Sequence, residues 1–388
     1  MGYRVKGKAY PNRRMMMVWC LVFIGIYACL PDTTLPPLQN AETLYPERTD
    51  GPFCVPEDFT TIDPDTFLAH FIDVGQGDAI WLQLPSGDPT DPVDILIDAG
   101  NAPAFSGGEA ADGGAVIQDY LTAHDMNPGE VIEWLIVTHG DSDHFGGIPT
   151  VLDAYNVGGF IGSGHANPSS SWASVRADIS AAVAANGGVF ASPPYPGLVQ
   201  NPGDVAISTP YSEVRILWPH SQSTGGLSSN EHGLVIKVTV HDVSLLLTAD
   251  IGESTELDLV SMHDNGVISL ESELLKVPHH GSSNSNTDAF LQRVFFNIPP
   301  EDRRAVIMSG MKSFGGVTLP TTEVLDKVHS MVGYGRQLST QHEDGSKEHG
   351  TEHDDDHILF TVSPTGVTRL CYHPSGTLPR VEQNDDDE

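Results

Sequence analysis

A short segment, "IVTHGDSDHFGG" (residues 136–147), restricts the fold of this chain more than any other feature. Two histidines and two aspartates fall within six residues, His139-Gly140-Asp141-Ser142-Asp143-His144, directly after an apolar run. A core cannot bury such groups without partners, whereas a loop at the end of a strand can aim them at a shared ligand. In an extended turn His139 and Asp141 can share one ion, and Asp143 and His144 can reach another. Because imidazole and carboxylate both suit zinc-like ions, the segment predicts a metal site at the C-terminal end of a buried strand.

Apolar periodicity on both sides of this segment predicts strands in two groups, with helices between and after them. The expected strands lie at 66–85 (two strands around a Gly-rich turn), 93–100, 133–138, 157–165, 212–219, 232–250, 273–283 and 357–372. The expected helices lie at 115–124, 146–155, 171–185 and 321–332. This order fits an α/β fold of two sheets with helices on their outer sides.

Four segments together carry a resemblance to a known family. "THGDSDHFGG" resembles the signature of the metallo-β-lactamase superfamily, in the variant with Asp in place of the commoner His at the third position. "FIDVGQGDAIWLQLP…ILIDAG", "LLLTADI" and "LLKVPHHGSSNS" occur in the order that this superfamily requires. Over residues 67–330 the chain is similar to the hydrolase domain of bacterial competence (DNA-uptake) proteins and to phosphorylcholine esterases. The resemblance implies a single catalytic domain with the αββα four-layer sandwich of the metallo-β-lactamase type.

The resemblance also implies a set of metal ligands. The expected ligands of the first ion are His139 and Asp141, those of the second are Asp143, His144 and His280, and Asp250 bridges both ions. Ala249 precedes Asp250 where the family usually has Gly, a small change that should leave the aspartate in place. His165, on the loop after the next strand, is the candidate for a third ligand of the first ion. The alternative is that His165 is an ordinary polar surface residue.

Other residues are expected to act around the metals. His279 should face the substrate, and Asp73, Gln76 and Asp98 should support the metal-binding loop. Competence proteins carry a histidine in a "YGHP"-like stretch near the end of the domain, whereas the corresponding run here, "SFGGVTLP" (313–320), has none. One group that contacts substrate is therefore missing or supplied elsewhere. Asn230 and Glu231 precede a strand and are expected only to form a turn.

The predicted function is a binuclear metal-dependent hydrolase of small or polymeric phosphoesters. Two divalent ions, zinc or also manganese, would hold a bridging hydroxide that attacks phosphorus. Asp143 would orient this hydroxide, and His279 would stabilise the transition state or protonate the leaving oxygen. The alternatives are a competence-type single-strand nuclease, a β-lactam hydrolase, or a non-catalytic surface binding protein on the same fold. A net charge of −33 argues against nucleic acid as a partner without excluding it.

The N-terminus has the features of an export signal. Residues 1–28 combine a basic start with a short apolar run, and "IYAC" resembles a bacterial lipobox. Cleavage before Cys29 would remove five basic residues and no acidic one, which takes the net charge from −33 to −38. We therefore expect an exported bacterial protein, either a lipoprotein anchored in the membrane through Cys29, periplasmic or on the cell surface, or a secreted protein. A plain signal peptide and an uncleaved anchor are the alternatives.

The remaining segments complete the expected organisation. Residues 29–66 read as a Pro/Thr-rich tether, 67–372 as the hydrolase domain, and 373–388 as an acidic tail. An acidic, His-rich insertion at 340–357 is expected to be a solvated loop, with weak metal binding as the alternative. In an oxidising compartment Cys54 and Cys371 should form a disulfide, although each could instead be a small buried hydrophobe. The resemblance to the family implies that the first and last strands of the domain lie in different halves of the sandwich.

Overall fold

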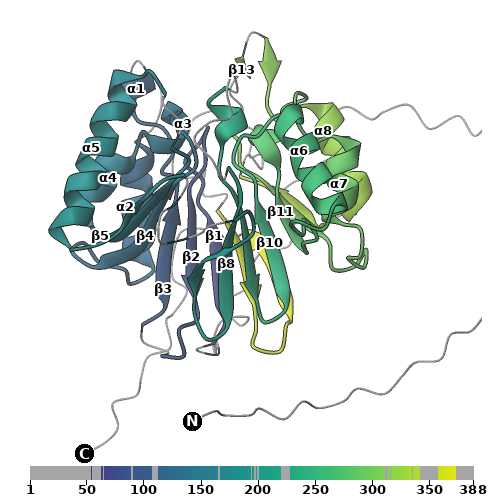
Figure 1. The fold of residues 1–388 in the computed structure, drawn as a ribbon, viewed down its shortest axis with the longest axis horizontal. Coiled ribbons are helices and arrows are strands. Elements are labelled where there is room, and N and C mark those ends of the chain that lie inside the picture. Colours follow the sequence, from purple (N-terminus) through teal and green to yellow (C-terminus); the bar gives the residue numbers. More distant parts are fainter. Residues whose placement is uncertain are drawn as a thin grey trace, which may run out of the picture. The chain divides into compact units, whose positions relative to one another are not determined.

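Two mixed β-sheets pack face to face, and helices cover the outer side of each (Figure 1). The computed structural model describes residues 54, 63, 65–88, 91–106, 112–164, 167–193, 195, 198, 201–219, 228–310, 313–314, 316–333, 335–340 and 357–372. All of these belong to one compact unit, Ala41–Glu388. This architecture is the predicted αββα sandwich, so the fold prediction is confirmed.

The eight-stranded sheet has the order β17-β16-β1-β2-β3-β4-β5-β6. Its strands are β1 (Phe67–Phe71), β2 (Ile80–Leu84), β3 (Val93–Ile97), β4 (Val131–Val137), β5 (Asn156–Gly162), β6 (Phe190–Ala191), β16 (Ile358–Val362) and β17 (Thr368–Tyr372). The chain segments between these strands form α1 (Pro103–Ser106), α2 (Gly113–Ala123), α3 (Ser142–Phe145), α4 (Ile148–Ala154) and α5 (Ser170–Ala185). Apolar residues of α2, α4 and α5 pack on the outer face of β3, β4 and β5.

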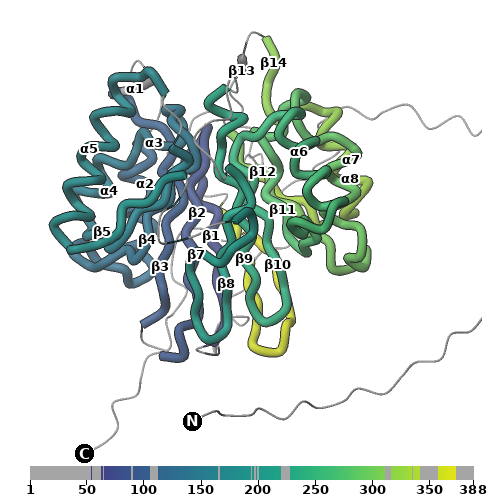
Figure 2. The backbone as a smooth tube through the Cα atoms, viewed as in Figure 1, coloured from purple at the N-terminus to yellow at the C-terminus, as the bar shows by residue number. Residues whose placement is uncertain are grey.

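The seven-stranded sheet has the order β15-β12-β11-β10-β9-β8-β7. Its strands are β7 (Val205–Ser208), β8 (Ser212–Trp218), β9 (Val235–Val240), β10 (Val243–Leu247), β11 (Leu274–Lys276), β12 (Arg304–Ile307) and β15 (Gln337–Ser339). Its outer face is covered by α6 (Glu253–Asp264), α7 (Asp288–Val294) and α8 (Thr322–Val332). A small hairpin of β13 (Ser313–Phe314) and β14 (Val317–Thr318) extends from the top of the view in Figure 2.

Successive side chains of a strand point to opposite faces of its sheet, so one strand contributes to two apolar cores. In β9 the side chains of Ile236, Val238 and Val240 belong to the core between the two sheets, while Val235 belongs to the core under the second helical layer. A strand buried on both faces reads as a near-continuous apolar run, and β10, "VSLLL", is such a strand. Three apolar interfaces therefore join the four layers.

The last hairpin lies beside the first strand. β16 pairs antiparallel with β1, with Phe67 opposite Val362, so both strands belong to the same sheet. The expectation that the first and last strands lie in different halves was therefore wrong. The physical reason is that β1 would otherwise present an unpaired edge, and the inward residues Phe360 and Val362 extend the core between the sheets.

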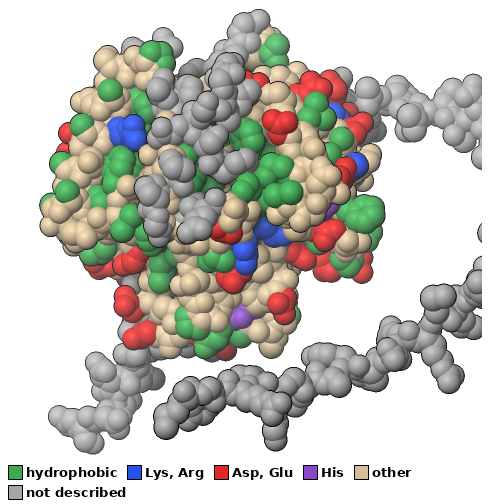
Figure 3. All heavy atoms as spheres, viewed as in Figure 1, with side chains coloured by type: hydrophobic (Ala, Val, Ile, Leu, Met, Phe, Trp, Pro, Cys, Tyr) green, Lys and Arg blue, Asp and Glu red, His purple; other side chains and the backbone are tan. Residues whose placement is uncertain are grey.

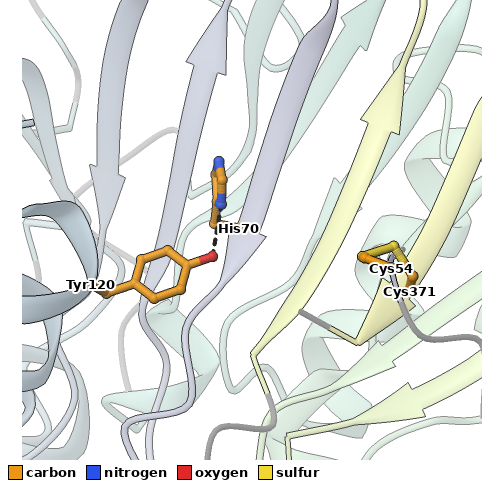
Figure 4. The surroundings of a disulfide bond; sticks show 4 residues. All are labelled: Cys54, His70, Tyr120 and Cys371. Atoms are coloured by element: carbon orange, nitrogen blue, oxygen red, sulfur yellow. Dashed lines mark hydrogen bonds between the residues drawn. A yellow bond between two sulfur atoms is a disulfide. The ribbon is translucent and has the colours of Figure 1, made fainter. Parts of the chain in front are cut away.

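A disulfide fastens the segment before β1 to this hairpin (Figure 4). Cys54 and Cys371 are bonded with their Cα atoms 5.1 Å apart, so the predicted bond is confirmed. The backbone N–H of Cys54 also donates to the carbonyl of Tyr372 at 2.9 Å. In the same figure, His70 Nδ1 of β1 lies 2.9 Å from the hydroxyl of Tyr120, which ties α2 to the sheet.

Several elements were not predicted from the sequence. The helices α6 and α7 and the strands β7, β12 and β15 lie in segments where no element of that type was expected. In α6, "ESTELDLVSMHD", the buried apolar side chains Leu259 and Val260 stand among polar residues, so the apolar stripe is too narrow to be visible in the sequence. Within the described residues, no helix is both long and apolar enough to cross a membrane. Residues 1–53, 341–356 and 373–388, with the predicted signal, most of the tether, the insertion and the tail, lie outside the described residues.

We expect the Cys54–Cys371 bond to stabilise the domain. It joins residues 317 positions apart, and the chain-entropy model gives a stabilisation on the order of 5 kcal/mol for such a loop, which measured disulfides often do not reach. Urea unfolding should therefore show a lower midpoint for the reduced protein than for the oxidised protein. The double variant Cys54→Ser/Cys371→Ser is the control, and its midpoint should not respond to reductant. Equal midpoints for oxidised and reduced wild type would contradict the expectation.

Candidate metal centre

The predicted site residues are delivered by the C-terminal ends of three strands. β4 ends at Val137, directly before the histidine and aspartate motif, and the short helix α3 begins at Ser142. In the other sheet, β10 leads to Asp250, and β11 leads to the 3-10 helix η5 (Pro278–Gly281) with its two histidines. Figure 1 shows α3 and the ends of these strands at the top of the view, where the two sheets face each other.

Close backbone approach is needed at this end of the sheets. A Cβ atom at Gly77 would lie 2.0 Å from the carbonyl oxygen of Asp143, and one at Gly147 would lie 2.2 Å from that of Ala99. Real Cβ atoms do not approach oxygen so closely, so the "GQG" turn and the motif loop can pack together only through glycine. Asp141 is the N-cap residue of α3, yet its side chain makes no capping hydrogen bond, which leaves the carboxylate available to a ligand.

Asp250 lies at the middle of the cluster. Its Oδ2 atom is 3.3 Å from Nε2 of His144 and 3.0 Å from Nε2 of His280. Nε2 of His280 also lies 3.7 Å from Oδ2 of Asp143. The residues predicted for the second ion, together with the predicted bridging aspartate, are therefore gathered in one place.

The residues predicted for the first ion lie next to this group. Nε2 of His139 is 3.7 Å from Oδ2 of Asp141, and the His139 and His144 ring centroids are 4.1 Å apart. Asn167 donates from Nδ2 to the Gly140 carbonyl at 2.6 Å and to Oδ1 of Asp141 at 3.3 Å, so it holds the Asp141 carboxylate in position. His165, the remaining candidate ligand, lies outside the described residues.

The donor atoms fit a divalent metal ion. Nε2 of His139, His144 and His280 are all buried, and none makes a hydrogen bond within the described part of the chain. A buried nitrogen without a partner costs free energy, and a metal ion satisfies such nitrogens where they lie in groups with carboxylates. His139, His144 and Asp250 form one group with ligand atoms within 4.8 Å of one another, and Asp143, His144 and His280 form another.

One buried carboxylate fixes the orientation of two of these rings. Asp98 accepts from the backbone N–H of Thr138 at 2.8 Å, from the Thr138 hydroxyl at 2.6 Å, and from Nδ1 of His144 at 2.8 Å. Because the hydroxyl gives its only hydrogen to Asp98, it accepts from Nδ1 of His139, 3.1 Å away. Both rings then present an unprotonated Nε2 to the metal, as partners behind metal-binding histidines generally arrange.

His280 has a different partner behind it. Its Nδ1 donates to the Met308 carbonyl at 2.8 Å, which again leaves Nε2 for a metal ion. Both His279 and His280 have left-handed backbone conformations, with φ of 50° and 52°. Such strain in residues other than glycine collects at functional sites, and here it turns two consecutive side chains in different directions.

The charged groups of the centre shift one another's pKa values. Burial raises the pKa of the Asp250 carboxyl, but the neighbouring His280 and His144 outweigh this and hold it well below its usual range. Burial lowers the pKa of His144, but Asp250 and Asp98 outweigh this and hold it well above its usual range. Burial, followed by the nearby His144, holds the pKa of His139 well below its usual range. A metal ion would compete with protons for Nε2 of His144 and His280.

His279 is directed to a neighbouring cavity. Its Nδ1 lies 2.9 Å from Oδ1 of Asn284, and its Nε2 lies 3.3 Å from Nδ2 of Asn230. The cavity has a volume of about 310 Å³, and the residues that line it include His279, Asp250, Asn230 and Asn284. His279 therefore adjoins the cluster without joining the three imidazoles of His139, His144 and His280 in it. A position at this cavity is what we expect of His279 if it faces the substrate.

Sequence reasoning missed or misjudged several of these residues. Asn230 belongs to the 3-10 helix η4 (Asn230–His232) and reaches His279, whereas only a turn was expected there. Lys276 is completely buried behind Asp250, and a lysine within the apolar run "LLKV" was an available signal. The sequence around Asn167 and Thr138 did not indicate their roles, because these roles depend on contacts with other segments.

Asp73 and Gln76 were expected to support the metal-binding loop. Asp73 accepts from the N–H of Gly75, and Gln76 accepts from the N–H of Gly310, so both act within the loops around the site.

Comparison with known proteins identifies related sequences. Residues 74–298 match the model of the family described as "Metallo-beta-lactamase superfamily". ComE operon protein 3 of Bacillus subtilis is 24% identical over 246 residues, which cover 62% of this chain and 28% of that protein. Recombination protein 2 of Haemophilus influenzae is 25% identical over 271 residues, which cover 70% of this chain and 27% of that protein. The chain thus spans less than a third of the length of these relatives.

One similar solved structure is that of the metallo-beta-lactamase fold protein YhfI from Bacillus subtilis. It is 11% identical in sequence and superimposes with a TM-score of 0.38, covering 71% of this chain and 96% of that chain.

The contacts of Asp98 generate a testable prediction. Asp98→Asn should weaken metal binding by about 10- to 100-fold, because the amide cannot hold both rings with Nδ1 protonated. Zinc affinity measured by competition with a chelator would check this. Asp94→Asn is the matched control, since Asp94 is a buried aspartate of β3 that accepts from the Trp81 indole instead, and its zinc affinity should stay at the wild-type value. Equal zinc affinity in Asp98→Asn and wild type would show that Asp98 does not orient the ligands.

Proposed function

Because this chain belongs to the metallo-beta-lactamase superfamily, whose members are metal-dependent hydrolases, we propose that it hydrolyses phosphoesters with two divalent metal ions. The observation that carries the proposal is the set of two overlapping ligand groups, whose three buried imidazole Nε2 atoms make no hydrogen bond within the described residues and lie beside the carboxylates of Asp141, Asp143 and Asp250. Two divalent ions held by these residues would suit displacement at phosphorus, because they would neutralise the negative charge that develops there. Zinc or manganese would suit such a nitrogen and oxygen ligand set.

Some residues of the centre would bind the metal ions, and one of them would also orient the attacking water. When bound, the ions would supply Lewis-acid activation of water and of the phosphoryl group. His139, Asp141, Asp143, His144, Asp250 and His280 would hold them. Asp143, which is partly exposed next to His280, would also orient the attacking water.

His279 would act on the leaving group. Asn284 holds Nδ1 of the ring, so Nε2 is turned toward Asn230, another residue that lines the cavity. Nδ1 needs its own hydrogen for the amide oxygen of Asn284, so Nε2 could give a proton or a hydrogen bond to a leaving oxygen in that cavity when the ring carries a proton on both nitrogens. The same position lies beside Asp250, so a substrate could contact the ions and His279 together.

The cavity walls favour a small phosphoester over a nucleic acid. Of the nine described residues that line the cavity, Glu231 and Glu253 add acidic groups to Asp250, and none is Lys or Arg. On the face drawn in Figure 3, acidic side chains of the described residues occur in many places, while basic side chains occur in a few separate spots. Nucleic-acid binding depends on phosphate contacts to Lys and Arg, so the second candidate, a single-strand nuclease, rests on the relatives and not on this surface.

A panel of substrates tests the proposal. The purified protein loaded with zinc or manganese should hydrolyse bis(p-nitrophenyl) phosphate or a phosphorylcholine ester, and a chelator should abolish the activity. Elemental analysis should find about two ions per chain. Hydrolysis of single-stranded DNA alone would favour the nuclease, and hydrolysis of a β-lactam alone would favour a lactamase. Failure to retain metal after careful loading would leave the non-catalytic alternative.

His279 and His280 should behave differently when they are replaced. His280→Ala should lower the metal content, because Nε2 of His280 lies among the ligands. His279→Ala should keep the metal ions and lower kcat on the order of 10²-fold, because a proton donor or charge stabiliser is lost. Metal content by elemental analysis and kcat on bis(p-nitrophenyl) phosphate separate the two effects. Equal loss of metal in both variants would show that the roles are wrongly assigned.

A further inference from the structure

Lys276 is a buried charge that the proposed reaction does not use. It is the last residue of β11, and its side chain is 0% exposed. Removing an ammonium from water is costly unless it is paired and hydrogen-bonded. Its Nζ forms an ion pair with Oδ2 of Asp78, donates to the Ala249 carbonyl at 3.0 Å, and lies 3.6 Å from Oδ1 of Asp250. The ammonium is therefore built into the metal centre and is well supplied with acceptors.

The two oxygens of Asp250 have different neighbours. Oδ2 lies 3.3 Å and 3.0 Å from the Nε2 atoms of His144 and His280, which are the atoms left for metal ions. Oδ1 makes no hydrogen bond within the described chain, and the ammonium of Lys276 is its ion-pair neighbour. The carboxylate thus has one oxygen at the imidazole nitrogens and the other next to a fixed cation.

Asp78 lies behind the imidazole rings. Its Oδ1 is 3.5 Å from Nδ1 of His280, and its Oδ2 is 4.0 Å from Nδ1 of His144, so it approaches the ring atoms that face away from the predicted ions. Nevertheless, Asp78, Asp250 and His280 offer ligand atoms within 4.8 Å of one another. Without a nearby ammonium, the carboxylate of Asp78 could attract a metal ion away from the predicted positions.

We propose that Lys276 is a positioning residue of the metal centre, which holds Oδ1 of Asp250 and the carboxylate of Asp78. Asp250 then presents only Oδ2 to the metal ions, and Asp78 stays outside their coordination. This inference goes beyond the proposed function. It requires that the centre binds metal, but it does not depend on which substrate is hydrolysed. A failure to hydrolyse phosphoesters would therefore leave it intact.

A purely structural role makes a different prediction. Replacing both members of a buried ion pair with neutral residues of similar volume often leaves stability unchanged or improved. A lysine that only filled the core would then be replaceable together with Asp78 without effect on the ions. A positioning lysine would not, because Oδ1 of Asp250 would be free to turn and to coordinate metal.

The experiment uses the full chain and the double variant Lys276→Met/Asp78→Asn. Thermal unfolding in chelator checks that the variant folds. Zinc affinity from chelator competition should fall by about 10- to 100-fold, as for other groups that orient metal ligands. The visible spectrum of the cobalt-loaded protein should change, because it reports the coordination geometry. Lys237→Met is the matched control, since Lys237 is a partly buried lysine of β9 that donates to the Glu271 carbonyl, and it should keep the wild-type affinity and spectrum.

Two results would overturn the inference. The first is a folded double variant with wild-type zinc affinity and an unchanged cobalt spectrum. The second comes from the wild-type protein and does not depend on a variant that folds. A crystal structure with zinc bound should show Oδ2 of Asp250 on the metal and Oδ1 beside Nζ of Lys276, whereas a zinc ion coordinated by Oδ1 or by Asp78 would refute the proposal.

Discussion

The hydrogen bonds of Asp98 are the interaction on which the rest of the centre depends. This single carboxylate is completely buried, and it contacts His144 directly and His139 through the Thr138 hydroxyl. It can do so because β3 and β4 are parallel neighbours, with Ile97 opposite Ile136, so the residues after each strand lie side by side. A change in the register of this strand pair by one residue would therefore separate the carboxylate from both rings.

The second half of the centre depends on the packing between the two sheets. Asp250, Lys276 and His280 come from the seven-stranded sheet, while His139, Asp143 and His144 come from the eight-stranded sheet. The apolar core between the sheets fixes their separation together with polar contacts that cross it, such as the Lys276–Asp78 ion pair, and that core draws on strands of both sheets, the last hairpin included. Backbone strain collects at the same end, since Ala249, His279 and His280 all have positive φ. The stability of the core thus compensates for strain that orients the ligands.

The sequence predicted the parts of this site that are local in the chain. The motif at 139–144 could be read directly because its spacing and its preceding apolar strand are contiguous, and the resemblance to the family gave Asp250 and His280. Lys276, Asn167 and Asn230 could not be assigned, because each acts through a partner in another segment. The expected position of the last hairpin, which followed from the resemblance to the family, was also wrong. An alternating pattern shows that a strand has a buried face without showing which strand pairs with it.

Charge balance links Lys276 to the number of metal ions. The aspartates at the centre are Asp78, Asp98, Asp141, Asp143 and Asp250, and among the described residues Lys276 is the only Lys or Arg in an ion pair with them. Five carboxylates and one ammonium leave four negative charges, which two divalent cations would neutralise while the histidines remain neutral. One divalent ion would leave two of these negative charges unbalanced, and unbalanced charge is costly beside carboxylates as buried as those of Asp78, Asp98 and Asp250. The same excess of negative charge explains the raised pKa values of two histidines, since the effect of burial is outweighed by Asp250, which holds the pKa of His144 well above its usual range and raises that of His280.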